Sequence, residues 1–236
     1  MKRDGRVLWS HDAQARHAPA SLAKMMTALL VLENGALNDV VTVSRAASRE
    51  TGSRIGLRAG EQLRVHALLA ATIVASANDA CRALADHFGG AMFVARMNQR
   101  AAELRLDDTH FVEPCGHDRP GQYSTAEDLA RLGEQVMQHP EYERLAALPS
   151  LTIRSLDGRR RYWLDNTNAL VGRYEGVIGV KTGTTWRAGN CLVAIAEKDG
   201  VRVLVVLLNA RRRWPSAEAL LDRAFAAPRP ARELGI

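Results

Sequence analysis

The strongest constraint on the fold of this chain is a change of residue pattern at Pro149. Before it, apolar residues recur every three to four positions, as in amphipathic helices; after it, apolar runs alternate with tight-turn signals. Asp157-Gly158 and Asp199-Gly200 are pairs that typically join two antiparallel strands. The strands that we expect in this half are residues 151–155, 160–164, 176–185, 190–198 and 201–210.

The first half is predicted to be mainly helical. The expected helices are Ser21 to about Glu33, then residues 65–76, 78–88, 92–105 and 125–138, with a closing helix at 216–226. Short strands are expected at 6–9, after the Asp4-Gly5 turn, and at 39–43. Together these elements predict an α+β fold, in which an antiparallel sheet is packed by N- and C-terminal helices and carries a mainly helical insertion at about 44–148. We expect one domain over residues 1–236.

Composition excludes several classes of protein. The chain has 236 residues, 47% of them hydrophobic, enough for a sizeable core, and no run approaches the roughly 18 apolar residues that cross a bilayer. Its net charge is +6, with arginine clusters at 159–161 and 211–213. Only 5% of residues are aromatic and no nucleic-acid motif accompanies the clusters, so we predict solvated faces, or attraction to an anionic polymer or membrane surface, and no nucleic-acid partner.

The cysteines and histidines do not suggest a metal site. Cys81, Cys115 and Cys191 are odd in number and lack CxxC spacing, so neither a disulfide framework nor a zinc ribbon is expected. His110, Cys115, His117 and Asp118 are close in sequence, but their spacing fits no ligand pattern. We predict no metal and no other cofactor.

The start of the first helix has an unusual charge. Ser21 could be its N-cap, but three residues later, where a capping box has Glu or Gln, the chain has Lys24. Only four of the 32 basic residues are lysines, and a lysine near the positive end of a helix and beside apolar surface should have a lowered pKa. Lys24 is therefore a candidate base for the Ser21 hydroxyl one turn away.

Two further short motifs are each weak evidence for a catalytic site when taken alone. Ser76-x-Asn78 could belong to a capping box that runs to Asp79. Lys181-Thr182-Gly183 lies in an expected strand; the preceding residues do not form a P-loop, because Val180 stands where glycine is needed. No GxSxG nucleophile elbow is present. The ordered set SxxK, SxN and KTG is more informative, since it occurs in β-lactamases and penicillin-binding proteins.

With these motifs the chain resembles the low-molecular-mass penicillin-binding proteins, which are serine-type D-Ala-D-Ala carboxypeptidases. The likeness runs from about residue 5 to 226 and includes "PASLAKMMTALL", "YSTAEDLARL" and "GVKTGTTWRAGNCLVAIAEKDG". It implies a peptidoglycan stem peptide ending in D-Ala-D-Ala as substrate, β-lactam antibiotics as covalent inhibitors, and a periplasmic or extracytoplasmic location.

The resemblance also implies roles for individual residues. Ser21 would form the acyl-enzyme, Lys24 would take its proton, Ser76 would pass a proton to the leaving amine, and Asn78 would hold Lys24 and the substrate amide. Lys181 would face the terminal carboxylate, assisted by the hydroxyls of Thr182 and Thr184. The N–H groups of Ser21 and Thr184, the latter next to Gly183, would form the oxyanion hole.

The chain departs from the family pattern at four positions and in extent. The family usually has Gly, Asn, Leu and His where this chain has Ala77, Glu113, His117 and Gln122. We expect these changes to affect substrate preference and the shape of loop 106–124. The family's signal peptide, first sheet strand and C-terminal β-domain are not recognised; the strand that pairs with residues 6–9 would precede Met1.

Three other functions stay open from the sequence. A D,D-endopeptidase of the same family would cleave peptidoglycan crosslinks. A serine β-lactamase would need a carboxylate that activates the deacylating water, for which Glu113 is the candidate. An inactive domain that only binds cell-wall peptide is disfavoured, because the set of catalytic residues is intact.

Overall fold

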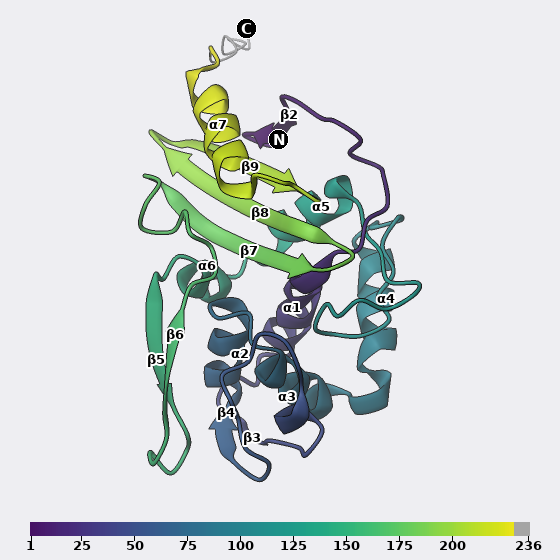
Figure 1. Ribbon diagram of the computed structural model, residues 1–236, viewed down its shortest axis with the longest axis vertical. Helices are drawn as coiled ribbons and strands as arrows, with labels where there is room; N and C mark the ends of the chain where they lie inside the picture. Colours follow the sequence, from purple (N-terminus) through teal and green to yellow (C-terminus); the bar gives the residue numbers. More distant parts are fainter. Residues whose placement is uncertain (229–236) are drawn as a thin grey trace, which may run out of the picture.

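A five-stranded antiparallel sheet lies at one end of the molecule, with most of the helices below it (Figure 1). The computed structural model describes residues 1–228. The strand order is β2-β1-β9-β8-β7, so the first and the last strand along the chain, β1 and β9, pair in the middle of the sheet. Its strands are β1 (Lys2–Arg3), β2 (Arg6–Val7), β7 (Val177–Thr185), β8 (Gly189–Lys198) and β9 (Val201–Leu207).

The N-terminal strands correct one expectation. The partner of β2 does not precede Met1; it is β1, with Lys2 opposite Val7, and β1 also pairs with β9. Asp4 and Gly5 both have positive φ angles, 46° and 78°, as a tight two-residue hairpin turn requires. The hairpin therefore closes within residues 1–7. The strand that lies between β2 and β9 is β1, which is two residues long.

The sheet has helices on both faces. Residues of β8 alternate between two apolar clusters: Val193 and Ile195 pack with α1 (Lys24–Asn34) and α5 (Ala126–Val136), whereas Leu192 and Ala194 pack with α7 (Arg213–Ala226). This alternation follows from the two-residue period of a strand whose faces are both buried. The predicted α+β class, with an antiparallel sheet packed by N- and C-terminal helices, is confirmed.

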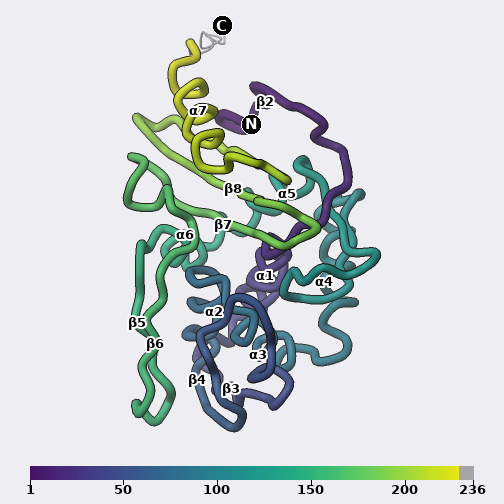
Figure 2. Tube along the Cα trace, in the orientation of Figure 1, coloured from purple at the N-terminus to yellow at the C-terminus, as the bar shows by residue number. Residues whose placement is uncertain are grey.

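From α1 the chain runs through the helices below the sheet and then returns to the sheet at β7 (Figure 2). It contains α2 (Val65–Ile73), α3 (Asn78–Phe88), α4 (Phe93–Glu103) and α6 (Pro140–Ala146). Two hairpins flank these helices: β3 (Val40–Thr42) with β4 (Gln62–Arg64), and β5 (Ser150–Arg154) with β6 (Arg161–Asp165). Helix α6 and strand β4 were not expected, because each is too short to show its period. Within residues 1–228, no helix has the length and apolarity that crossing a membrane would need.

Candidate active site

Ser21 lies in a 3-10 turn, Ala20–Ala23, that leads directly into α1. The helix begins at Lys24 with Ala23 as its N-cap residue, and no side chain caps it. The interpretation of Ser21 as an N-cap is therefore wrong. Its hydroxyl is not used to satisfy the helix end and can take part in chemistry.

Lys24 is buried, with 1% of its surface exposed, and its amine is surrounded by oxygen atoms. Nζ lies 2.9 Å from Ser21 Oγ and 2.6 Å from Asn78 Oδ1, and it also donates to the Cys115 carbonyl. Burial lowers the pKa of Lys24 to about 7, although the negative charges of Glu113 and Glu50 oppose the shift. The predicted fall of this pKa is thus supported, with loss of solvation as its main cause.

Ser76 lies in the turn between α2 and α3, and Asn78 is the first residue of α3. Ser76 has a positive φ of 57°, uncommon for a residue other than glycine, and the helix begins at Asn78 without a side-chain cap. The carboxylate of Asp79 instead accepts the backbone N–H groups of residues 55–57, at 2.9–3.2 Å. The alternative of a capping box is therefore wrong. Asn78 Nδ2 donates to Thr51 O at 2.6 Å, which directs Oδ1 toward Lys24.

Strand β7 carries the second buried lysine. Lys181 Nζ donates to Ser76 Oγ at 2.8 Å and to Thr182 O at 3.1 Å, and the Thr182 hydroxyl is 2.6 Å from that of Thr167. Burial, together with the positive charges of Lys24 and Arg213, lowers the pKa of Lys181 well below its ordinary value. A ligand carboxylate would oppose this shift, because it would favour the charged form of Lys181.

Two glycines let the segments approach Ser21 closely. A Cβ atom on Gly183 would lie 3.0 Å from Ser21 N. A Cβ atom on Gly116 would overlap Ala20 O and lie 2.7 Å from Ser21 N, and Gly116 has a φ of 89°. Only glycine fits these positions without displacing the turn that carries Ser21. β7 consequently runs beside the start of α1 (Figure 1).

All the site residues predicted from the sequence belong to this one region. Ser21, Lys24 and Asn78 are connected through Lys24 Nζ, Ser76 and Lys181 form a second pair, and Gly183 lies against Ser21 N. Thr182 follows Lys181 in β7, and the Thr184 hydroxyl donates to Gly183 O at 2.7 Å.

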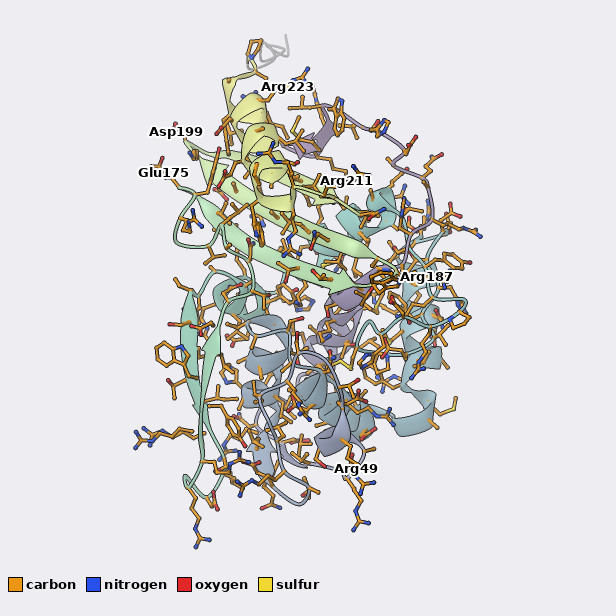
Figure 3. The ribbon with its side chains drawn as sticks, viewed as in Figure 1. Arg49, Glu175, Arg187, Asp199, Arg211 and Arg223 are labelled. Atoms are coloured by element: carbon orange, nitrogen blue, oxygen red, sulfur yellow. A yellow bond between two sulfur atoms is a disulfide. The ribbon has the colours of Figure 1, made fainter. Side chains whose placement is uncertain are left out.

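Arg213 is a residue of this region that was not predicted from the sequence. Its Nη1 donates to Gly183 O, Thr184 Oγ1 and Cys191 O, each at 3.1 Å, while its buried Nε has no partner among the described residues. The prediction of a solvated cluster holds for Arg211 and Arg212, which are exposed, but not for Arg213. Arg211, labelled in Figure 3, precedes α7, whereas Arg213 is its first residue. This position beside β7 could not be recognised from a run of three arginines.

A disulfide also corrects the sequence analysis. Cys81 of α3 and Cys115 are bonded, with an S–S distance of 2.15 Å, and both are buried; Cys191 is a free, buried thiol. The two partners are 34 residues apart, so no local spacing reveals them.

The histidines of this loop bind other groups of the protein. His117 Nε2 lies 2.9 Å from Glu50, and His110 Nδ1 lies 2.9 Å from Gly121 O. In the described part of the chain, no group of three or more His, Cys, Asp or Glu residues could hold a metal ion.

Glu113 shapes the loop that contains Cys115. Its carboxylate accepts the N–H groups of Cys115 at 3.0 Å, of His117 at 2.8 Å and of Gly116, and also Gln122 Nε2 at 3.1 Å. Both oxygens are therefore occupied by the loop itself. A carboxylate bound in this way is poorly suited to activate a water molecule, which argues against the role that a β-lactamase would need.

The same loop is fastened to the turn between β7 and β8. Asp118 accepts the Thr185 hydroxyl at 2.6 Å and Arg187 N at 3.0 Å. Arg187, labelled in Figure 3, marks this turn, which lies next to the start of α1. Two substitutions relative to the family pattern, Glu113 and Gln122, thus belong to the hydrogen bonds that order one wall of the site.

A serine hydroxyl beside a buried lysine of lowered pKa, next to a strand bearing a second lysine, is the arrangement of an acyl-transferring serine enzyme. Residues 2–212 match the model of the peptidase S11 family, described as D-alanyl-D-alanine carboxypeptidase. The chain belongs to this family.

Known relatives and solved structures agree with this assignment. The chain is 35% identical to D-alanyl-D-alanine carboxypeptidase DacF of Bacillus subtilis over 96% of its own length and 61% of that protein. It is 33% identical to DacB2 of Mycobacterium tuberculosis, with 94% and 79% covered. The Streptomyces K15 DD-transpeptidase superposes with a TM-score of 0.90 at 30% identity, and 95% of this chain and 94% of that one are covered. The chain thus spans about three fifths of DacF.

Proposed function

We propose that this chain is a serine D,D-carboxypeptidase that removes the terminal D-Ala from peptidoglycan stem pentapeptides. The observation that carries the proposal is the 2.9 Å distance between Ser21 Oγ and a Lys24 amine whose pKa is about 7. A base with this pKa is half neutral at physiological pH, so it can accept the serine proton. The names of DacF and DacB2 support the substrate class.

The acylation step follows from the proposed roles. Ser21 Oγ attacks the carbonyl carbon of the D-Ala-D-Ala bond while its proton moves to Lys24 Nζ. The N–H groups of Ser21 and Thr184 stabilise the oxyanion. When the C–N bond breaks, Ser76 gives its proton to the leaving amine, while Lys181, whose Nζ donates to Ser76 Oγ at 2.8 Å, stabilises the charge on that oxygen and stays protonated. The proton that Lys24 took from Ser21 then restores the Ser76 hydroxyl. Water then hydrolyses the Ser21 ester.

Recognition of the terminal carboxylate is assigned to β7 and its surroundings. Lys181 and Arg213 supply positive charge, and the Thr182 and Thr184 hydroxyls can donate hydrogen bonds. The contacts of Arg213 with Gly183 and Thr184 support this role, because they put its guanidinium next to the strand that would bind the substrate. A β-lactam carries a carboxylate in an equivalent place, so we expect such antibiotics to acylate Ser21.

An extracytoplasmic site of action, with peptidoglycan as the partner, follows from this function. The Cys81–Cys115 disulfide supports it, because disulfides persist mainly in oxidising compartments outside the cytoplasm.

Labelling with a fluorescent penicillin tests the proposal. The parent should be labelled covalently and Ser21→Ala should not, whereas Ser10→Ala, which changes an exposed serine, should behave as the parent. Circular dichroism would show that Ser21→Ala is folded. Absence of label in the parent, or equal label in Ser21→Ala, would refute the acyl-enzyme.

Muropeptide analysis then separates the possible reactions. A carboxypeptidase converts pentapeptides to tetrapeptides with release of D-Ala, whereas loss of crosslinked dimers without loss of pentapeptide would indicate an endopeptidase. Fast penicillin turnover that disappears in Glu113→Ala would indicate a β-lactamase instead.

A further inference from the structure

We propose that the Cys81–Cys115 disulfide positions Lys24. The disulfide holds two oxygen atoms that accept hydrogen bonds from the Lys24 amine at a fixed distance from each other. The inference depends on the proposed role of Lys24 as the base. The acceptors are Asn78 Oδ1 and the Cys115 carbonyl, which come from different segments of the chain.

Helix α3 carries one of the two acceptors and one of the two cysteines. Asn78 and Cys81 are three residues apart in this helix, so both side chains project from the same face. Asn78 uses that face to reach Lys24, and Cys81 uses it to bind Cys115. The disulfide thus ties the loop to the one helix face that already presents an acceptor to the lysine.

The other connections of the loop are hydrogen bonds. Thr27 Oγ1 donates to Pro114 O at 2.7 Å, Glu113 accepts N–H groups of the loop, and His117 is 2.9 Å from Glu50. Each such bond typically contributes only about 1 kcal/mol net. Among the described residues, the disulfide is the covalent link between this loop and α3. Without it, the Cys115 carbonyl can move away from Nζ while the fold persists.

The effect on chemistry has a defined sign. A carbonyl oxygen close to the amine stabilises its protonated form, so loss of this acceptor should lower the pKa of Lys24 further. Loss of one of its three oxygen partners also leaves the amine less well placed against Ser21, and a misplacement of about 1 Å can cost up to about 100-fold in rate. We therefore expect slower acylation together with an altered pH dependence.

The test compares the double variant Cys81→Ala/Cys115→Ala with the parent. The second-order rate of acylation by a fluorescent penicillin is measured from pH 5 to 9. At the high-pH plateau of this pH–rate profile, the double variant should acylate about tenfold more slowly than the parent. The acidic limb of the profile, where the rate rises with pH, should move to lower pH. The control is Leu84→Ala, one turn further along α3, which removes buried volume without touching the loop bond. It should lower the melting temperature and leave the acidic limb in place.

Each result is decisive. An unchanged rate and limb in the double variant, or the same shift in Leu84→Ala, would overturn the inference. Thiol titration of the unfolded, unreduced parent should find one free thiol, Cys191, and three would also overturn it. Failure of the proposed function would be seen separately, because the parent would then take no label at Ser21.

Discussion

The amine of Lys24 lies 2.9 Å from the hydroxyl of Ser21, and the lysine is buried, with 1% of its surface exposed. A lysine is useful as a base only in its neutral form, which for a pKa of about 7 is the main species above neutral pH. The acylation rate should accordingly rise with pH and reach half of its plateau near pH 7.

The charge of Glu113 should control this midpoint. Glu113 raises the pKa of Lys24, so Glu113→Gln should move the acidic limb to lower pH, while the amide oxygen can still accept N–H groups of the loop. Glu50→Gln should also move the acidic limb to lower pH, by a smaller amount. The measurement is the pH profile of penicillin acylation, with Glu175→Gln, on an exposed glutamate, as control. A limb that stays in place, or moves to higher pH, would contradict the electrostatic explanation.

Gly116→Ala should damage the site through backbone sterics. The added methyl group would overlap Ala20 O and press on Ser21 N, so we expect acylation to fall at least about 100-fold. Gly60→Ala is the matched control, since Gly60 also has a positive φ, 83°, but nothing lies within 4 Å of the added atom. It should cost about 1 kcal/mol of stability and leave acylation intact. Equal acylation rates in the two variants would show that the contact with Ala20 is unimportant.

Arg213→Leu should weaken recognition of the substrate's terminal carboxylate. For a peptide ending in a free D-Ala carboxylate, KM should rise about tenfold, as loss of a charged hydrogen bond of about 1.5 kcal/mol implies. A thioester substrate without that carboxylate should be little affected. Arg212→Leu, at the exposed neighbouring position, should leave both substrates unchanged. A uniform loss for both substrates would instead indicate a structural role for Arg213.

Lys24 should make stability depend on pH. Its pKa is about 7 in the folded state and about 10.4 in an unfolded chain, so between these values the unfolded state binds more protons. The free energy of unfolding contributed by this group should therefore increase by about 1.4 kcal/mol per pH unit as the pH rises from 7 to 10. Urea unfolding of Lys24→Met should show a smaller slope than the parent. Lys198→Met, on a lysine that is not fully buried, should keep the parent's slope. Equal slopes in Lys24→Met and the parent would contradict the burial argument.

The sequence was sufficient for the parts of the fold and site that depend on local patterns. Helix α3 was predicted with its observed bounds, and the predicted end of the first helix at about Glu33 is within one residue of the end of α1 at Asn34, because periodicity is a short-range property. The serine and lysine of the first motif could be paired from helix geometry, whereas Ser76 and Lys181 required recognition of the ordered motifs.

The parts that were missed depend on contacts between distant segments. The run of three arginines does not indicate that its last member begins a helix against β7. The Cys81–Cys115 bond requires a loop whose course is set by Glu113 and Gln122. Asp79 looked like the third residue of a capping box, but its carboxylate accepts N–H groups of residues 55–57 and of Ala80. Tertiary contacts override local preference in each case.

The pairing of β1 with β9 has a consequence for synthesis of the chain. Lys2 lies opposite Leu204, and Arg3 donates to Ala224 O and Ala227 O, so one edge of β1 has to wait for segments about 200 residues further along the chain. Contacts of such high sequence separation slow folding. Ser21 likewise meets Gly183 late. We expect a nascent chain to remain without a working nucleophile until its last strands are complete.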